Sequence, residues 1–235
     1  MTSSEHVAPG ERIVVVSPHL DDGVLSLGAV MASWAKGGAQ VELLTVLACD
    51  PESDTSAGGW DRRGGFSTEG DAARARREED QRACAIVGVS PVWLPFGSVD
   101  YDRHGDEHAV LESIAPRIGD ADLVVLPGFP LSHPDHAWLM RAIARGGILR
   151  GQIAYYAEQP YSARIESEPR LPDWLASEAS ASDSFKSVAA RPLHRFEKWR
   201  AIRQYRSQLP LLAIRGVRSG AYVHAWRRES VASLI

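Results

Sequence analysis

The stretch from Ile13 to Gly23, IVVVSPHLDDG, decides the fold class of this chain. It begins with a β-branched run of the kind found in strands that are buried on both faces of a sheet. The run ends at Ser17-Pro18, and from Asp21 to Trp34 apolar residues recur at helical spacing until two glycines end the pattern. Residues 41–47 then form a second strand pattern. Strand, helix and strand in close succession predict a right-handed βαβ unit in a parallel sheet.

The same alternation continues toward the C-terminus. Apolar periodicity predicts helices over 71–87, 107–118, 137–144 and 196–209, and strands over 92–94, 123–126, 152–157 and 221–226. Residues 50–70 have no period and are expected to form a long loop, and the proline-rich stretch 160–192 to form irregular chain or short helices. We therefore expect one three-layer α/β domain with a mostly parallel sheet, a core at 13–158 and a C-terminal covering segment at 159–235.

The composition argues against several classes of function. The 235 residues include 26 basic and 30 acidic side chains, so the basic surface of a nucleic-acid-binding protein is not expected. No apolar run approaches the ~20 residues of a membrane span, and Met1–Arg12 lacks the apolar segment of a signal peptide. We expect a cytoplasmic protein with no membrane partner. Cys49 and Cys84 form neither a disulfide framework nor a CxxC motif, and the missing GxGxxG motif makes a dinucleotide cofactor unexpected.

Two polar clusters each follow a predicted strand: His19 to Asp22, and His133 to His136. In doubly wound sheets of the common order 3-2-1-4-5, ligands bind where the first and fourth strands lie side by side. His19 and Asp22 stand three residues apart at a strand-to-helix corner and can point at one spot. Together with one histidine of the second cluster they would form the open tetrahedral site of a catalytic Zn²⁺. Another divalent ion such as Fe²⁺ is the alternative, and Asp21 is free to take a proton from water.

Other interpretations of these residues stay open. Aspartates and histidines at strand ends are often helix caps. His19 and Asp21 with a distal histidine also match the triad of non-haem iron oxygenases, although such sites usually lie in antiparallel β scaffolds. A glycan-binding protein that keeps an inactive site is the alternative from another class.

Candidate substrate contacts come from aromatic and basic side chains at strand ends and in loops, where aromatic rings can stack on a sugar. Arg74 belongs to a charged run that ends at Glu79, which a solvated helix face would also explain. The candidates are Trp60, Arg63, Arg74, Tyr101 and Tyr156, with Tyr155 and Tyr161 as further aromatic residues.

The segments Pro18-His19-Leu20-Asp21-Asp22-Gly23 and His133-Pro134-Asp135-His136 resemble the two hallmark motifs of the LmbE/PIG-L family of zinc-dependent N-deacetylases. Weaker similarities lie at Arg76–Val89, Tyr155–Tyr161 and Lys198–Gln208, so that the resemblance spans residues 13–210. It implies a Rossmann-like fold and hydrolysis of an N-acetyl or other N-acyl group from an amino-sugar-containing small molecule or glycoside, such as an N-acetylglucosamine unit. A mycothiol-conjugate-type amidase or a tailoring deacetylase of natural products fits equally well.

The resemblance also implies a role for each motif residue. It makes His19, Asp22 and His136 the zinc ligands and Asp21 the general base. His133 would stabilise the oxyanion or protonate the leaving amine, with Asp135 as the residue that orients it. Leu20 and Gly23 stand where the family has proline and glutamate. The first change is expected to alter only the rigidity of the corner, and the second to alter substrate positioning while the ligands stay intact.

Overall fold

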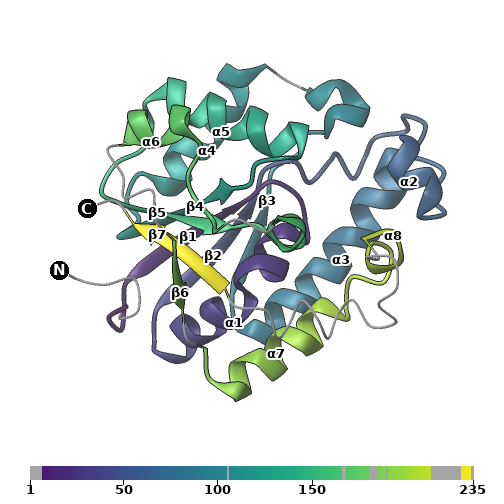
Figure 1. Ribbon diagram of the computed structural model, residues 1–235. Helices are drawn as coiled ribbons and strands as arrows, with labels where there is room; N and C mark the ends of the chain where they lie inside the picture. Colours follow the sequence, from purple (N-terminus) through teal and green to yellow (C-terminus); the bar gives the residue numbers. More distant parts are fainter. Residues whose placement is uncertain are drawn as a thin grey trace.

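The computed structural model describes residues 7–104, 106–165, 168–179, 185–188, 190–212 and 229–233. Within these residues one sheet has the strand order β3-β2-β1-β4-β5-β7-β6 (Figure 1). Its strands are β1 (Arg12–Ser17), β2 (Gln40–Thr45), β3 (Ser90–Trp93), β4 (Leu123–Phe129), β5 (Gln152–Ala157), β6 (Lys186–Val188) and β7 (Glu229–Ser233). The strands β1 to β5 pair in parallel, whereas β7 pairs antiparallel with both of its neighbours. The expected order 3-2-1-4-5 is confirmed.

Helices cover both faces of the sheet (Figure 1). One layer contains α1 (Asp22–Lys36), α3 (Glu69–Val87) and α7 (Pro192–Ile202), and the other contains α4 (Glu107–Ile118), α5 (Pro134–Gly146) and α6 (Asp173–Ala179). Alternate residues of β1 face the two layers, since Ile13 packs with the first and Val14 with the second. Both are fully buried, which explains why this strand is apolar without alternation. The three-layer α/β prediction is confirmed.

Several element boundaries differ from the predictions. The expected loop over 50–70 contains the short helix α2 (Gly59–Arg63), and α3 begins at Glu69 after Thr68, whose hydroxyl accepts from the N–H of Asp71 at 3.1 Å. The helix predicted over 196–209 is split into α7 and the short α8 (Leu209–Leu212). The covering stretch holds the 3₁₀ helix η2 (Tyr161–Arg164), α6 and β6. The strand predicted over 221–226 lies outside the described residues.

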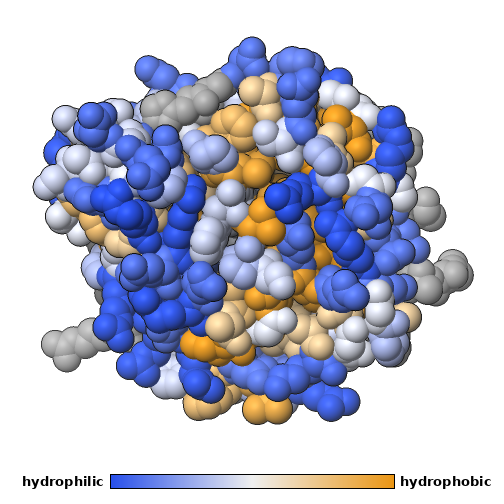
Figure 2. All heavy atoms as spheres, turned by 180° about the vertical axis from the view of Figure 1, so that it is seen from behind, coloured by the Kyte–Doolittle hydropathy of each residue, from blue (hydrophilic) through white to orange (hydrophobic). Residues whose placement is uncertain are grey.

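The surface on the side opposite to the view of Figure 1 is largely hydrophilic, with apolar residues in patches between the polar ones (Figure 2). Among the described helices, none combines the length and the apolar character that crossing a bilayer requires. The carboxyl ends of β1 and β4 lie side by side, because the two strands are parallel neighbours in the sheet. Both polar clusters of the sequence follow these two ends.

Candidate active site

Three potential metal-ligand atoms meet beyond the carboxyl ends of β1 and β4. Nδ1 of His19 and Nε2 of His136 lie 3.1 Å apart, and Oδ2 of Asp22 lies 3.2 Å from the former and 3.1 Å from the latter. Tetrahedral zinc with bonds of about 2.0–2.1 Å would place its ligand atoms roughly 3.3 Å apart. His133 offers a further nitrogen, and one ligand atom from each of the three histidines lies within 4.8 Å of the others. The distances within the triangle of His19, Asp22 and His136 are close to those of a zinc site.

Two strand-to-helix corners bring the triangle together. In the β1–α1 corner the N–H of His19 donates to Oδ2 of Asp22 at 3.0 Å, and the hydroxyl of Ser17 donates to the carbonyl of His19 at 2.6 Å. His136 lies in the first turn of α5, whose N-cap is His133. The two sequence clusters thus face each other at the point where the strand order reverses.

A carboxylate holds the other ring nitrogen of each triangle histidine. Nε2 of His19 lies 3.1 Å from Oδ2 of Asp135, and Nδ1 of His136 is hydrogen-bonded to Oε1 of Glu158. When these nitrogens carry the protons, the nitrogens of the triangle present lone pairs to a metal. Glu158 is fully buried and also accepts from the N–H of Leu131 at 2.8 Å. Glu158 was not predicted to belong to the site, because no local sequence pattern shows that it meets His136.

The carboxylate of Asp135 is placed differently from the expectation that it orients His133. It lies 3.1 Å from Nε2 of His19 but 3.8 Å from Nδ1 of His133. Its oxygens also accept from the N–H of Val99, at the start of the 3₁₀ helix η1 (Val99–His104), at 3.1 and 3.2 Å. What holds His133 is the backbone N–H of Asp135, which donates to Nδ1 at 3.2 Å. The carboxylate of Asp135 therefore orients His19 more directly than His133.

The charges around the triangle favour a cation. Burial lowers the pKa of His19, but hydrogen bonds to Asp135 and Asp22 outweigh burial and raise this pKa to about 9. Burial also lowers the pKa of His136, but Asp22 and Glu158 outweigh it and raise this pKa well above its ordinary value. Burial opposes ionisation of Asp22, yet the two histidines hold its pKa well below the usual range. A proton or a metal ion is therefore attracted to this cluster.

Asp21 and His133 border the cavity beside the triangle. Asp21 is the N-cap of α1, but its carboxylate makes no capping hydrogen bond, and burial together with the charge of Asp22 raises its pKa to about 7. Burial and the charge of His19 lower the pKa of His133 to about 4, so this ring is neutral at neutral pH. Because Nδ1 of His133 accepts the N–H of Asp135, the proton of the neutral ring lies on Nε2.

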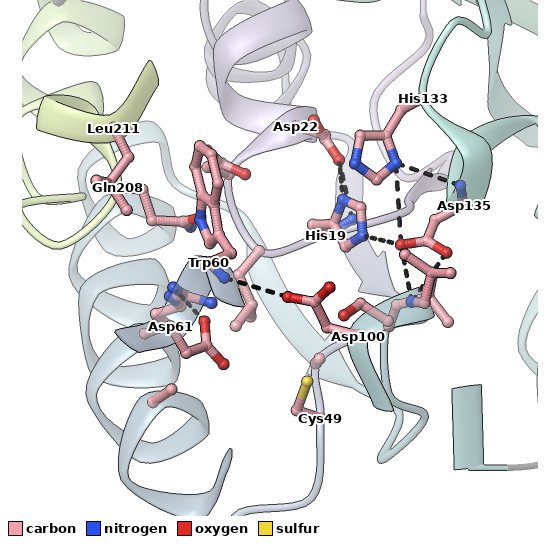
Figure 3. A pocket seen from close by; sticks show the side chains of 18 of the residues that line it. His19, Asp22, Cys49, Trp60, Asp61, Asp100, His133, Asp135, Gln208 and Leu211 are labelled. Carbon is pink, nitrogen blue, oxygen red and sulfur yellow. Dashed lines mark hydrogen bonds and ion pairs between the residues drawn. The ribbon is translucent and has the colours of Figure 1, made fainter. Parts of the chain in front are cut away.

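A cavity of about 530 Å³ extends from the triangle (Figure 3). This volume is within the range of small-molecule sites, about 300–1,000 Å³. In Figure 3, His19 and His133 lie at one side of the cavity, Gln208 and Leu211 at the opposite side, and Trp60 between them. The walls are partly apolar and partly polar: Leu20, Leu47, Trp60, Val99, Leu211 and Leu212, and Asp61, Arg63, Arg76, Asp100, Tyr101 and Gln208.

Three of the expected substrate-binding residues border this cavity: Trp60, Arg63 and Tyr101. The guanidinium of Arg63 lies 5.1 Å from the ring centre of Trp60. Tyr161 also borders the cavity, and its ring lies edge-on to that of His136 with centres 5.4 Å apart. These side chains are placed where a substrate bound beside the triangle would meet them.

The other two expected substrate-binding residues lie elsewhere. Arg74 is exposed outside the cavity, where it donates to the carbonyl of Pro51 and to Asp71. Tyr156 is fully buried in the core, and its hydroxyl donates to the carbonyl of Val16 at 3.1 Å. Tyr155 is buried on the other face of the same strand. Alternation along β5 turns both tyrosines into the two cores, so we correct these assignments.

The charged run of α3 is not wholly a solvated face. The side chain of Arg76 is 11% exposed and pairs with Asp61 at 2.5 Å, while Asp61 also accepts from the hydroxyl of Tyr101. Glu79 is buried and accepts from the N–H and the hydroxyl of Ser207 at 2.9 and 2.8 Å. This helix therefore shapes the cavity wall and holds the C-terminal segment.

Position 23 faces the sheet and not the cavity. A Cβ atom at Gly23 would lie 2.5 Å from Cδ1 of Leu43 and 3.3 Å from Oγ of Ser17. A side chain at this position would require the Leu43 side chain to move. Leu20 borders the cavity and Gly23 does not, and the expected effect of Gly23 on substrate positioning stays a prediction.

Comparison with known proteins agrees with the fold and with the motifs. The family model described as GlcNAc-PI de-N-acetylase (PIG-L) matches residues 14–145. The 2′-N-acetylparomamine deacetylase of Streptomyces fradiae is 30% identical over 175 residues, which are 66% of this chain and 60% of that protein. The 4-oxalmesaconate hydratase of Pseudomonas putida is 28% identical over 189 residues, 80% of this chain and 62% of that protein. The chain thus spans about 60% of the length of these relatives.

A solved structure gives the same result for the fold. The A40926 pseudoaglycone deacetylase superposes with a TM-score of 0.75 at 25% sequence identity, and the match covers 95% of this chain and 96% of that one. The shared architecture therefore extends beyond residues 14–145, which the family model matches.

Proposed function

Because the chain belongs to the GlcNAc-PI de-N-acetylase (PIG-L) family, we propose that it is a metal-dependent hydrolase that removes an N-acetyl group from an amino-sugar-containing small molecule. The observation that carries this proposal is the triangle of His19, Asp22 and His136, whose three ligand atoms lie 3.1–3.2 Å apart beside a cavity. The names of two similar proteins, acting on 2′-N-acetylparomamine and on the A40926 pseudoaglycone, support a natural product as the substrate.

His19, Asp22 and His136 would hold the metal ion. Two imidazole nitrogens and one carboxylate oxygen suit zinc, and the same donor set accepts Fe²⁺. A divalent ion bound there lowers the pKa of a water molecule and polarises the carbonyl oxygen of the amide. Asp135 and Glu158 keep the two imidazoles in the required orientation through the hydrogen bonds described above.

Asp21 and His133 would assist the attack of water on the amide carbon. Asp21 takes the proton of the water, since its carboxylate borders the cavity and is not used in the helix cap. Nε2–H of His133 donates to the oxygen that becomes negative as the amide carbon turns tetrahedral. The proton held by Asp21 then passes to the nitrogen of the leaving amine, and the C–N bond breaks to give acetate and a free amine.

A hydratase is the second candidate, because the Pseudomonas putida relative matches 80% of this chain. Addition of water to a carbon–carbon double bond would use the same general base. The iron oxygenase alternative is disfavoured, since the triangle lies on parallel strands and not in an antiparallel β scaffold.

The test is amine release from a panel of N-acetyl amino sugars and acetylated aminoglycosides, followed with fluorescamine, with the metal content of each variant measured. We expect Asp21→Asn to keep the metal and to lose roughly 10²- to 10⁴-fold in rate, and His136→Ala to lose the metal. Asp54→Asn, at an exposed loop position, is the matched control.

Full activity of Asp21→Asn, or full metal content of His136→Ala, would contradict the assigned roles. Turnover of 4-oxalmesaconate without amine release would favour the hydratase. Sugar binding without any amine release would favour the inactive glycan-binding alternative.

A further inference from the structure

The turn between α7 and α8, residues Tyr205–Gln208, is fastened to α3 by two buried carboxylates. The hydroxyl of Tyr205 donates to Oδ1 of Asp80 at 2.7 Å. The N–H and the hydroxyl of Ser207 donate to the two oxygens of Glu79 at 2.9 and 2.8 Å. Tyr205 and Asp80 are fully buried, and Glu79 is 7% exposed. The backbone of Gln208 is therefore fixed relative to the helix that forms one wall of the cavity.

The side chain of Gln208 borders the cavity from this turn. It is 5% exposed, and Figure 3 shows it beside Leu211, across the cavity from His19. Its backbone is already paired, since its N–H donates to the carbonyl of Tyr205 at 3.3 Å and its own carbonyl accepts from Leu211 and Leu212 at 2.9 and 3.0 Å. Among the residues that the structure describes, none forms a hydrogen bond with its side-chain amide.

The amide atoms of Gln208 are not enclosed without a partner, so they face the open space of the cavity, where water or a ligand can pair with them. A primary amide donates and accepts, so a sugar hydroxyl, which does both, is its natural complement. Trp60, Leu211 and Leu212 supply apolar surface in the same cavity. An amide next to apolar side chains suits a ring that has hydroxyl groups at its edge and C–H groups on its faces.

We propose that Gln208 is a specificity-determining residue whose side-chain amide hydrogen-bonds a ring hydroxyl of the amino-sugar substrate. The inference rests on the proposed function for the class of substrate. Because Gln208 lies across the cavity from His19, the hydroxyl that it binds belongs to the part of the substrate away from the N-acetyl group. Gln208 thus selects among acetylated sugars, while the triangle is common to all of them.

Binding is measured by titration calorimetry in the Asp21→Asn background, which prevents turnover. The probes are N-acetylglucosamine, N,N′-diacetylchitobiose and their monodeoxy analogues. Gln208→Leu removes both hydrogen-bonding groups, and Gln208→Glu keeps an acceptor. Gln204→Leu is the matched control, because Gln204 lies in the adjoining turn, donates to the carbonyl of Arg200 at 3.2 Å and does not border the cavity.

We expect Gln208→Leu to weaken binding of at least one probe roughly 10- to 100-fold, with Gln208→Glu between it and the parent and Gln204→Leu unchanged. The monodeoxy analogue that lacks the hydroxyl bound by Gln208 should bind the parent roughly 10- to 100-fold more weakly than the intact sugar does. This analogue should bind Gln208→Leu as tightly as it binds the parent. Unchanged metal content and thermal unfolding show that each variant is folded, and Gln208→Glu decides the matter if Gln208→Leu does not fold.

The proposal is overturned if both Gln208 variants bind every probe as tightly as the parent does, or if the parent binds none of the probes. It is also overturned if, for every deoxy analogue, the loss of affinity from the missing hydroxyl adds to the loss caused by Gln208→Leu. A protein with wild-type Asp21 that binds these sugars through Gln208 but releases no amine would refute the hydrolase and leave the role of Gln208 intact.

Discussion

Glu158 accepts two hydrogen bonds inside the protein, from Nδ1–H of His136 and from the N–H of Leu131 at 2.8 Å. Both partners donate, so both carboxylate oxygens are needed as acceptors. An amide at this position offers one oxygen and one NH₂ group, and the NH₂ group would face a donor. The charge of Glu158 also makes the ring of His136 a stronger metal ligand.

We therefore predict that Glu158→Gln weakens metal binding about 10- to 100-fold, the usual effect of losing a partner of a metal-bound histidine. Competition with a chelator for Zn²⁺ or Co²⁺ measures it directly. Glu112→Gln, which changes an exposed glutamate on α4, is the control. Equal affinities of the Glu158 and Glu112 variants would show that Glu158 does not position the ligand.

Single residues also show where sequence reasoning reaches its limit. The meeting of His19 with His136 could be predicted, because each follows a strand and the topology places those strands side by side. Glu158 could not, since its partner is chosen by how α5 packs over the end of β5. The packing of Gly23 could not be predicted either, since a Cβ atom there would lie 2.5 Å from Cδ1 of Leu43 on a different strand.

The helix α3 joins β3 to the turn after α7 through the carboxylate of Asp80. Oδ2 of Asp80 accepts from Nε1 of Trp93 at 2.7 Å, and Oδ1 accepts from the hydroxyl of Tyr205 at 2.7 Å. Burial raises the pKa of Asp80 to about 6, although both hydrogen bonds lower it. This junction should therefore make the packing of α3 depend on pH.

The sign follows from proton binding. The pKa of an aspartate in the unfolded chain is about 3.9. Between pH 4 and 6 the folded protein holds a proton on Asp80 that the unfolded chain has lost. The contribution of this group to the free energy of unfolding therefore falls as pH rises, by roughly 3 kcal/mol in total. We predict that the stability difference between wild type and Asp80→Asn shrinks by this amount from pH 4 to 7 in urea unfolding. A stability difference between wild type and Asp80→Asn that is constant with pH would contradict the prediction.

Some elements were predictable from their apolar residues. The predicted bounds of α4 and β5 agree with the structure, because α4 has a clear period of 3.6 and β5 is a short apolar run buried on both faces. The helix predicted to begin at Phe196 begins at Pro192 in the structure. In the structure Phe196 is 48% exposed, while Lys198 on the same helix is fully buried. A helix that buries a paired charge and exposes an aromatic ring reverses the usual pattern.

The buried charge of Lys198 connects the last strand of the described chain to the first helix. Nζ of Lys198 lies 2.5 Å from Oε1 of Glu229, the first residue of β7. The carboxylate also accepts from the N–H groups of Ala29 and Val30 in α1, at 3.1 and 2.8 Å. One carboxylate thus links α1, α7 and the antiparallel strand β7, an arrangement that a pattern of parallel strands cannot predict.

Removing one partner of this pair should cost far more than removing an exposed one. Lys198→Met keeps most of the apolar stem of the side chain. This stem packs so closely on Gly28 that a Cβ atom added there would lie 2.9 Å from it. The substitution leaves the charge of Glu229 buried without its cation. Breaking a buried pair in this way typically costs about 3–5 kcal/mol. Lys36→Met is the control, because Lys36 is 62% exposed and its pair with Glu197, at 3.5 Å, should contribute about 1 kcal/mol or less. Urea unfolding of both variants gives the comparison, and similar losses would mean that Glu229 is satisfied by the α1 amides alone. In that case α7 would not be needed to hold β7 against the sheet.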